Sequence, residues 1–213
     1  MYVPSAFAVG DRAFALDLIA QHPFGLLASC SEEHLQATHL PMIARSEADE
    51  LWIAGHVARG SPHARQILEG RHATAIFQGP HAYVSPTWYE APYTNVPTWN
   101  YTAVHAAGRL EECDPRRFLD RLTAVFESET SPAWTTARMD AAYYEKQLHG
   151  IVAFEMQVDR LDVVAKLSQN RSEADRARVI ERLSASARES DRACAQAMLA
   201  SSGEPEKKNR GSD

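Results

Sequence analysis

The sequence predicts an α+β domain built on an antiparallel barrel or sheet. About six strands are expected, with helices interspersed among them. Short strands joined by tight polar turns are typical of antiparallel sheets. The chain has no βαβα alternation, which argues against a Rossmann fold. With 213 residues, 45% of them hydrophobic, it can bury a core for one substantial domain plus an appendage.

The first quarter of the chain predicts one helix followed by three strands. Asp11 is expected to cap a helix over residues 11–21, which Pro23 terminates. Pro41 cannot donate to a ladder, so the strand that contains it is expected to have an edge or a bulge there. The predicted strands are residues 24–30, 35–44 and 51–57, joined by polar turns at residues 31–34 and 46–50.

The middle of the chain predicts a short helix and three more strands. Ser61 is a good N-cap and Pro62 suits the first helical position, so a helix should run to about Gly70. Gly79 and Pro80 are expected to break the next strand into two. The predicted strands are residues 72–78, 81–85 and 98–111, with a proline-punctuated loop over residues 86–97.

The last third predicts helices around one closing strand. Asp114 and Pro115 repeat the cap-then-proline pattern, and Ser172 opens a capping box. The helix that begins at Ser172 should end at about Ala200, with a break near residues 184–190. The other predicted elements are helices to about residue 129 and over residues 140–148, a closing strand at 150–158, and a disordered tail from 201.

Composition excludes several classes of protein. A net charge of −6 argues against a binder that covers DNA phosphates with a basic face. No stretch approaches the ~20 apolar residues of a membrane helix, and no secretory signal is visible, so we expect a cytoplasmic protein. The three cysteines are far apart and predict neither disulfides nor a CxxC pair. No lysine precedes Lys146, so an anion bound earlier in the chain must meet arginine, histidine, hydroxyls or backbone N–H groups.

Several common functional motifs are missing. The sequence has no G-x-G-x-x-G, Walker A loop, G-x-S-x-G or HExxH. Its nine histidines are scattered and lack the compact spacing of zinc motifs, so no metal site is predicted. No catalytic residue is predicted either.

Five segments together resemble one known family. They are Ala37-Thr-His-Leu-Pro41, Gly55-His-Val-Ala-Arg-Gly-Ser-Pro62, Phe77-Gln-Gly-Pro-His-Ala-Tyr-Val-Ser-Pro86 with Thr87-Trp-Tyr89, Asn95-Val-Pro-Thr-Trp-Asn-Tyr101 and Lys166-Leu-Ser-Gln-Asn-Arg171. In this order they resemble the PaiB-like family of FMN-binding negative transcriptional regulators, from Met1 to about Ala200.

The resemblance implies a fold, a cofactor and an assembly. The fold would be a split β-barrel related to flavin reductases and pyridoxamine-phosphate oxidases, with flanking helices and a C-terminal helical extension. The family is usually dimeric with FMN near the dimer interface, and in some bacteria it regulates sporulation and protease production. The implied division is residues 1–160 for the barrel, 161–200 for a loop and helix packed on the barrel or the partner, and 201–213 for the tail.

The residues themselves indicate where a flavin could bind. FMN needs a flat slot for its ring and an anion site for its phosphate. Arg59 and Ser61 flank a strand-to-helix turn that could bind phosphate, although it is also an ordinary capped helix with a surface arginine. Gln78 and Gly79 could meet the pyrimidine edge of the ring, or Gly-Pro could simply turn the chain.

Two further groups complete the candidate site. Trp88, Tyr89, Trp99 and Tyr101 are a dense aromatic set that could stack on a ring or fill a core or interface. The segment from Lys166 to Arg171 could form a second polar patch, or could pin the C-terminal helix. Asn100 should face away from Trp99, and His105 toward the same side as Trp99. The predicted cofactor residues are Thr38, His39, Leu40, Pro41, His56, Arg59, Ser61, Gln78, Gly79, Trp99, His105, Lys166, Gln169, Asn170 and Arg171.

Three functions fit the sequence. The first is a flavin-binding regulator that acts as a homodimer and indirectly, through a protein partner, because no helix-turn-helix is visible. The second is an oxidoreductase that uses FMN or, less well supported, haem with NAD(P)H; the flavin carries the chemistry, so the lack of a conspicuous catalytic acid does not exclude it. The third is a cofactor-free interaction module.

Overall fold

The computed structural model describes residues 1–30, 34–48 and 50–201. The predicted turns at 31–34 and 46–50 lie partly outside these residues, as does nearly all of the predicted tail. The chain divides into two compact units. Unit 1 comprises Met1, Gly10–Phe77 and Val104–Asp162. Unit 2 comprises Tyr2–Val9, Gln78–Ala103 and Val163–Asp213.

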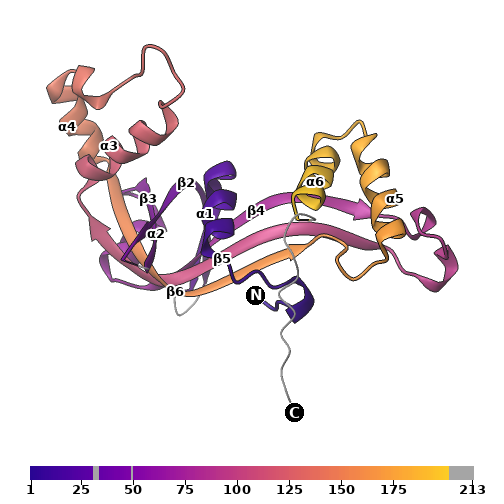
Figure 1. The fold of residues 1–213 in the computed structure, drawn as a ribbon. Helices are drawn as coiled ribbons and strands as arrows, with labels where there is room; N and C mark the ends of the chain where they lie inside the picture. Colours follow the sequence, from indigo (N-terminus) through magenta and orange to yellow (C-terminus); the bar gives the residue numbers. More distant parts are fainter. Residues whose placement is uncertain (31–33, 49, 202–213) are drawn as a thin grey trace. The chain divides into compact units, whose positions relative to one another are not determined.

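Six strands form a closed barrel in the order β1-β2-β3-β6-β5-β4, which confirms the predicted antiparallel barrel (Figure 1). The strands are β1 (Phe24–Cys30), β2 (Leu35–Glu47), β3 (Glu50–Ala58), β4 (His72–Val84), β5 (Thr98–Cys113) and β6 (Ile151–Lys166). The helices are α1 (Arg12–Gln21), α2 (Pro62–Leu68), α3 (Pro115–Phe126), α4 (Ala141–His149), α5 (Glu173–Ser184) and α6 (Glu189–Ala200). Four 3₁₀ turns are η1 (Ser5–Phe7), η2 (Pro86–Trp88), η3 (Pro92–Thr94) and η4 (Thr136–Arg138).

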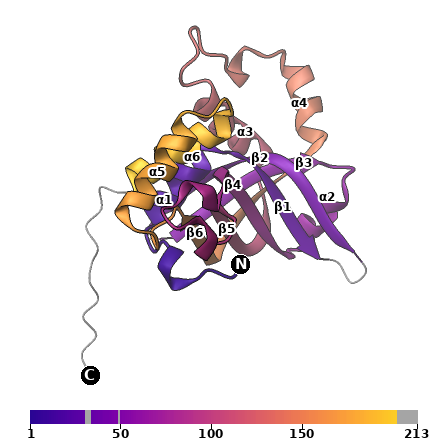
Figure 2. The ribbon, with the colours of Figure 1, turned by 90° about the vertical axis from the view of Figure 1, so that its right-hand side faces the viewer.

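Four predicted caps, and a fifth at Asp140 that the sequence predicts only as the start of a helix, set where the helices begin. At Asp11, Ser61, Asp114, Asp140 and Ser172, the side-chain oxygen accepts a backbone N–H from the first turn of its helix. The predicted break in the C-terminal helix is also confirmed, because α5 and α6 are separate helices that pack side by side in unit 2 (Figure 2).

Pro41 lies where β2 changes partners. The ladder with β1 runs as far as Pro41, opposite Phe24, and the ladder with β3 begins at Met42. A residue that cannot donate a hydrogen bond is tolerated at such an end of a ladder. The predicted irregularity in this strand is therefore a change of partner.

The prediction that Gly79 and Pro80 divide a strand is wrong. β4 is continuous from His72 to Val84. Buried and less buried residues alternate along it, but the phase shifts between Gly79 and Ala82, as expected for a bulge. Since the ladder with β1 covers only Ala73–Ile76, the missing N–H of Pro80 breaks no bond with β1.

The closing strand is longer than predicted. The alternation in the sequence places its end at Val158, but β6 continues to Lys166. Its exposed middle is polar, and it becomes buried again at Val163. The expected boundary between residues 160 and 161 thus falls inside a strand.

The core of unit 1 is filled by side chains from every strand. Leu27, Ile53, Phe77 and Phe154 are fully buried, and each such side chain contributes roughly 1.5–3 kcal/mol to stability. Gly108 marks the closest backbone approach, because a Cβ added there would lie 2.0 Å from the carbonyl oxygen of Gln157. In the described part of the chain, every helix is too short or too polar to cross a membrane.

Candidate functional site

The predicted cofactor residues divide between the two units. Those in unit 1 come from β2, β3, the turn before α2, and β5. Those in unit 2 come from the second part of β4, the start of β5, and the segment that ends β6. Unit 1 holds Thr38, His39, Leu40, Pro41, His56, Arg59, Ser61 and His105, and unit 2 holds Gln78, Gly79, Trp99, Lys166, Gln169, Asn170 and Arg171.

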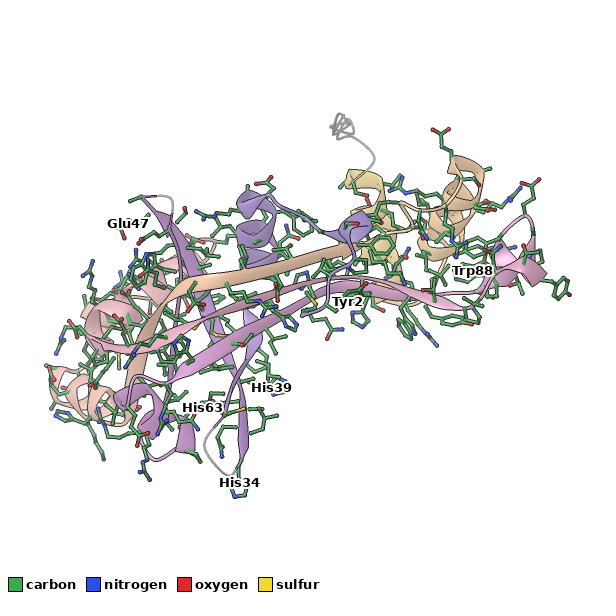
Figure 3. The ribbon with its side chains drawn as sticks, turned by 90° about the horizontal axis from the view of Figure 1, so that it is seen from below. Tyr2, His34, His39, Glu47, His63 and Trp88 are labelled. Atoms are coloured by element: carbon green, nitrogen blue, oxygen red, sulfur yellow. The ribbon has the colours of Figure 1, made fainter. Side chains whose placement is uncertain are left out.

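A buried hydrogen-bond network in unit 1 contains the predicted residue Thr38. The His63 ring of α2 lies between two hydroxyls, with Nδ1 2.7 Å from Oγ1 of Thr38 and Nε2 2.8 Å from Oγ of Ser29. Ser29 in turn donates to Oε1 of Gln66. The network therefore ties α2 to β1 and β2, where Figure 3 shows His63 and His39.

The network has one consistent direction. Because the Ser29 hydroxyl donates to Gln66, Nε2–H of His63 donates to Ser29. Burial lowers the pKa of His63 below 6.5, which favours the neutral imidazole, and in the neutral ring Nδ1 accepts from the Thr38 hydroxyl. Ser29 and His63 resemble a nucleophile and base, but both are too deeply buried to meet a substrate.

His39 belongs to a different surface of unit 1, the β4–β1–β2 face, which turns away from the core. Its ring stacks on Phe24, with centroids 6.1 Å apart. Cross-strand pairing places Leu26 between His39 and Ile76 in the centre of this face. The described members of the face include no Lys, Arg, Asp or Glu. It consists of Phe24, Leu26, Ala28, Cys30, Leu35, Ala37, His39, Pro41, Thr74 and Ile76.

Arg59 is held by backbone groups of unit 1. Its Nε donates to the carbonyl of His149 and its Nη2 to the carbonyl of Ile151, each at 2.9 Å. Ser61 caps α2 by accepting N–H of Ala64 at 3.3 Å. Both side chains therefore have structural partners, and a phosphate role for this turn remains a prediction.

The other predicted residues of unit 1 are partly or wholly buried. The Leu40 side chain lies in the core, so a ligand could meet only its backbone. His56 packs on Phe118 with centroids 5.5 Å apart, and its buried Nδ1 has no hydrogen-bond partner. Burial lowers the pKa of His56. Burial and the N-terminal amine lower that of His105, against an opposing effect of Asp162.

In unit 2, three aromatic rings lie together beside an amide. The exposed Trp99 ring is 5.9 Å from Tyr83, edge-on, and 6.4 Å from His81. Nδ1 of His81 lies 3.1 Å from the carbonyl oxygen of Gly79 and 3.2 Å from Nε2 of Gln78. The phase shift in β4 is what allows Gln78 and His81, three residues apart, to share this side of the strand.

The predicted aromatic set of Trp88, Tyr89, Trp99 and Tyr101 is not one cluster. Trp99 packs against His81 and Tyr83, whereas Tyr89 is buried beneath Arg171, whose guanidinium lies 4.5 Å from the ring centroid. Alternation along β5 nonetheless holds, because Asn100 is buried while Trp99 is exposed.

The cations of the 166–171 segment hold the preceding loop of unit 2. Nζ of Lys166 donates to Oγ1 of Thr98 at 2.5 Å, and Nη1 of Arg171 donates to Oδ1 of Asn95 at 2.5 Å. Burial, and then repulsion from Arg171, lower the pKa of Lys166. Thus both predicted cations converge on the short stretch between residues 95 and 98.

Gln169 does not present its amide to a ligand. Its Oε1 accepts the N–H of Leu167 at 2.7 Å, and its Nε2 donates to the carbonyl of Ala165 at 2.5 Å. The side chain therefore braces its own loop, where Ser168 has a φ of 64°. Asn170 is exposed next to it.

Two open cavities in unit 1 contain no predicted residue. They have volumes of about 420 and 320 Å³ and lie along α3 and η4. Asp120 and Thr136 line both, and Trp134 lines the larger. Among the residues that the structure describes, no three His, Cys, Asp or Glu side chains are placed to hold a metal ion.

Sequence reasoning missed the partners of the predicted residues. Ser29, His63 and Gln66 have no local signal, because they lie 25–37 residues from the groups they contact. Asn95 and Thr98 lie inside a recognised segment, but their roles depend on cations about 70 residues later.

The chain is similar to known proteins both in sequence and in fold. A family model described as "Putative FMN-binding domain" matches residues 1–160. "Protease synthase and sporulation protein PAI 2" of Bacillus subtilis (strain 168) is 33% identical over 178 residues, covering 81% of this chain and 84% of that protein.

Two solved structures share the fold. The FAD and heme binding protein from Mycobacterium smegmatis superimposes with a TM-score of 0.58 at 19% identity, covering 79% of this chain and 78% of that one. The flavocytochrome Anf3 from Azotobacter vinelandii gives 0.59 at 12% identity, covering 80% and 75%. At these identities the likeness concerns fold alone, and the predicted α+β split-barrel class is confirmed.

Proposed function

We propose that this protein binds FMN, because the chain belongs to the family described as "Putative FMN-binding domain". The predicted resemblance to the PaiB-like family is thereby confirmed. Membership of this family over residues 1–160 is the observation that carries the proposal. Unit 2 contains the side chains whose chemistry can be compared with that of FMN: an exposed indole, an amide and two cations.

The residues of unit 2 fit the chemistry of a flavin. A flavin ring needs a flat aromatic surface and an amide or backbone group at its polar edge. Trp99 offers an exposed indole, and Gln78 an amide beside it. Lys166 and Arg171 offer positive charge for the phosphate. When bound, FMN would supply the redox chemistry, while these groups would orient it.

Removing the exposed indole tests the flavin site. Trp99→Ala is expected to weaken FMN binding about three- to tenfold, because stacking of an aromatic ring contributes about 1 kcal/mol beyond buried area. The measurement is quenching of FMN fluorescence, preceded by an absorption spectrum of the natively purified protein.

Trp134→Ala is the matched control, because Trp134 is 46% exposed where Trp99 is 51% exposed. It should bind FMN like the wild type. A colourless wild-type protein that leaves FMN fluorescence unchanged would reject flavin binding altogether.

We propose further that the flavin-bound protein is a negative regulator of gene expression in the cytoplasm. Support comes from the relative in Bacillus subtilis, whose name assigns it to protease synthesis and sporulation. The net charge of −6 favours action through a partner protein over direct DNA binding. Sequence-specific DNA binding at nanomolar concentration in a low-salt gel shift would refute the indirect route.

The working form is proposed to be a homodimer built on the β4–β1–β2 face. An uncharged face can meet its own two-fold copy without like-charge repulsion. Its exposed Phe24 and Leu35 are unusual for a surface that stays in water. A second copy is therefore the occupant that this face fits best.

Charge placed on this face should break the dimer. Phe24→Arg is expected to convert a dimer to a monomer in light scattering, because each interface would bury two unpaired guanidinium groups. Val96→Arg is the matched control, since Val96 is 70% exposed in unit 2 where Phe24 is 68% exposed. A dimer that survives Phe24→Arg would contradict this interface.

An oxidoreductase is the second candidate. Its support is that the two structural neighbours are described as flavin proteins, one binding haem and one a flavocytochrome. Steady-state oxidation of NAD(P)H with added FMN distinguishes the two functions. A rate no faster than that of free flavin would reject the enzyme.

A further inference from the structure

Lys166 and Arg171 differ from three other partly buried cations of the protein, Arg45, Arg121 and Arg178. Arg45 and Arg121 both contact Glu155, and Arg178 contacts Asp175. Lys166 and Arg171 donate instead to neutral oxygens, and within the described residues no carboxylate forms an ion pair with either of them.

This arrangement is electrostatically incomplete. Two cations five residues apart are anchored to one short stretch, Asn95 and Thr98, and both are half-buried. Like charges that are partly removed from water repel each other more strongly than they would at the surface. Burial, and then repulsion from Arg171, lower the pKa of Lys166. Among the residues that the structure describes, no carboxylate is supplied here, although the protein has six more acidic than basic residues.

A second, independent observation lies in the same group of residues. The Tyr89 ring lies beneath the guanidinium of Arg171, and its buried hydroxyl has no hydrogen-bond partner. A buried hydroxyl without a partner costs about 1–3 kcal/mol. Thus the described part of unit 2 holds together two cations without a carboxylate partner and one buried hydroxyl without a hydrogen-bond partner.

We propose that Lys166 and Arg171 jointly bind an oxyanion of the phosphate class. Guanidinium can donate two parallel hydrogen bonds to such a group, and the ammonium supplies a compact charge. The phosphate of FMN is one source, and in that case the inference rests on the proposed function. A free or differently esterified phosphate is the other source, and it needs no flavin. Arg59, predicted from sequence for this role, is exposed and donates to two carbonyls, whereas Lys166 and Arg171 are half-buried.

Inorganic phosphate is the first probe. Isothermal titration calorimetry is expected to show that inorganic phosphate binds to the wild type and binds at least tenfold more weakly to K166Q/R171Q. The reason is that charge-assisted hydrogen bonds contribute more binding free energy than neutral ones. R138Q/K146Q removes the same charge from exposed positions and is the matched control, expected to behave like the wild type.

The second arm compares FMN with riboflavin, which lacks the phosphate. If FMN is the source, K166Q/R171Q loses at least tenfold in affinity for FMN and less than threefold for riboflavin. If only inorganic phosphate binding is lost, another phosphate compound is the source. A wild type that binds no flavin would reject the proposed function, while the first arm would still decide this inference.

The proposal is overturned if K166Q/R171Q matches R138Q/K146Q in both arms. A double variant that fails to fold is replaced by K166Q alone, compared with K166R. Because arginine keeps the charge, K166R should bind the probe like the wild type and K166Q should not. Equal binding by these two single variants would likewise overturn the oxyanion site.

Discussion

Gly108→Ala is expected to lower the free energy of unfolding by about 3 kcal/mol or more, or to prevent folding. The added Cβ would lie 2.0 Å from the carbonyl oxygen of Gln157 and 2.9 Å from the Met156 side chain. Since the first contact is with backbone, no rotamer change can relieve it, and β5 and β6 must separate locally. Overpacking that displaces backbone is among the most destabilising single changes.

Urea unfolding followed by circular dichroism measures this effect. Gly60→Ala is the control, because a Cβ at Gly60 would meet nothing within 4 Å. It should change the unfolding free energy by less than about 1 kcal/mol. If Gly108→Ala unfolded at the same urea concentration as Gly60→Ala, the close approach of the two strands would be refuted.

His63→Leu is expected to lower the free energy of unfolding, measured by urea unfolding, by about 2–4 kcal/mol. The substitution keeps an apolar side chain of similar size but leaves the hydroxyl of Thr38 without its acceptor and the hydroxyl of Ser29 without its donor. A buried polar group that loses its partner costs about 1–3 kcal/mol. His72→Leu, at a position 69% exposed, should change stability little.

The free energies of unfolding of the wild type and His63→Leu, each measured at pH 7.5 and at pH 5.5, test the protonation state of His63. Burial lowers the pKa of His63 in the folded protein below 6.5, so the unfolded chain takes up a proton first as the pH falls. Stability is therefore full above pH 6.5 and declines below it. His22, His56 and His105 share this direction, so His63→Leu should reduce the decline without abolishing it. An unchanged decline would show that His63 is not the neutral centre of the network.

The fold was predictable because its boundaries are local. Caps and prolines such as Asp11, Ser61 and Asp114 act within one helical turn, so the sequence reveals them directly. The errors came from long-range effects. Pro80 looks like a strand breaker, but β4 tolerates it beyond the end of the β1 ladder. Asp159 looks like a strand end, but neighbouring strands carry β6 through it.

The candidate site was predictable only as a set of residue types. The sequence placed Lys166 and Arg171 in a polar patch but could not show that no carboxylate within residues 1–30, 34–48 and 50–201 pairs with them. The sequence also placed Thr38 beside a ligand, but it could not show that the Thr38 hydroxyl forms a hydrogen bond with His63. Partners of this kind depend on strand register and helix placement, which single-sequence patterns do not encode.

The continuity of the long strands has a consequence for how this chain can be shortened. The boundaries between the two units fall inside β4, β5 and β6, so no single cut releases either unit intact. A fragment ending at residue 160 would sever β6 and remove the buried Val163, Val164 and Ala165. Neighbouring strands would then present unpaired N–H and C=O groups, which recruit other chains. Such a fragment should aggregate, and deletions that shorten this protein without loss of solubility should be confined to the residues beyond α6.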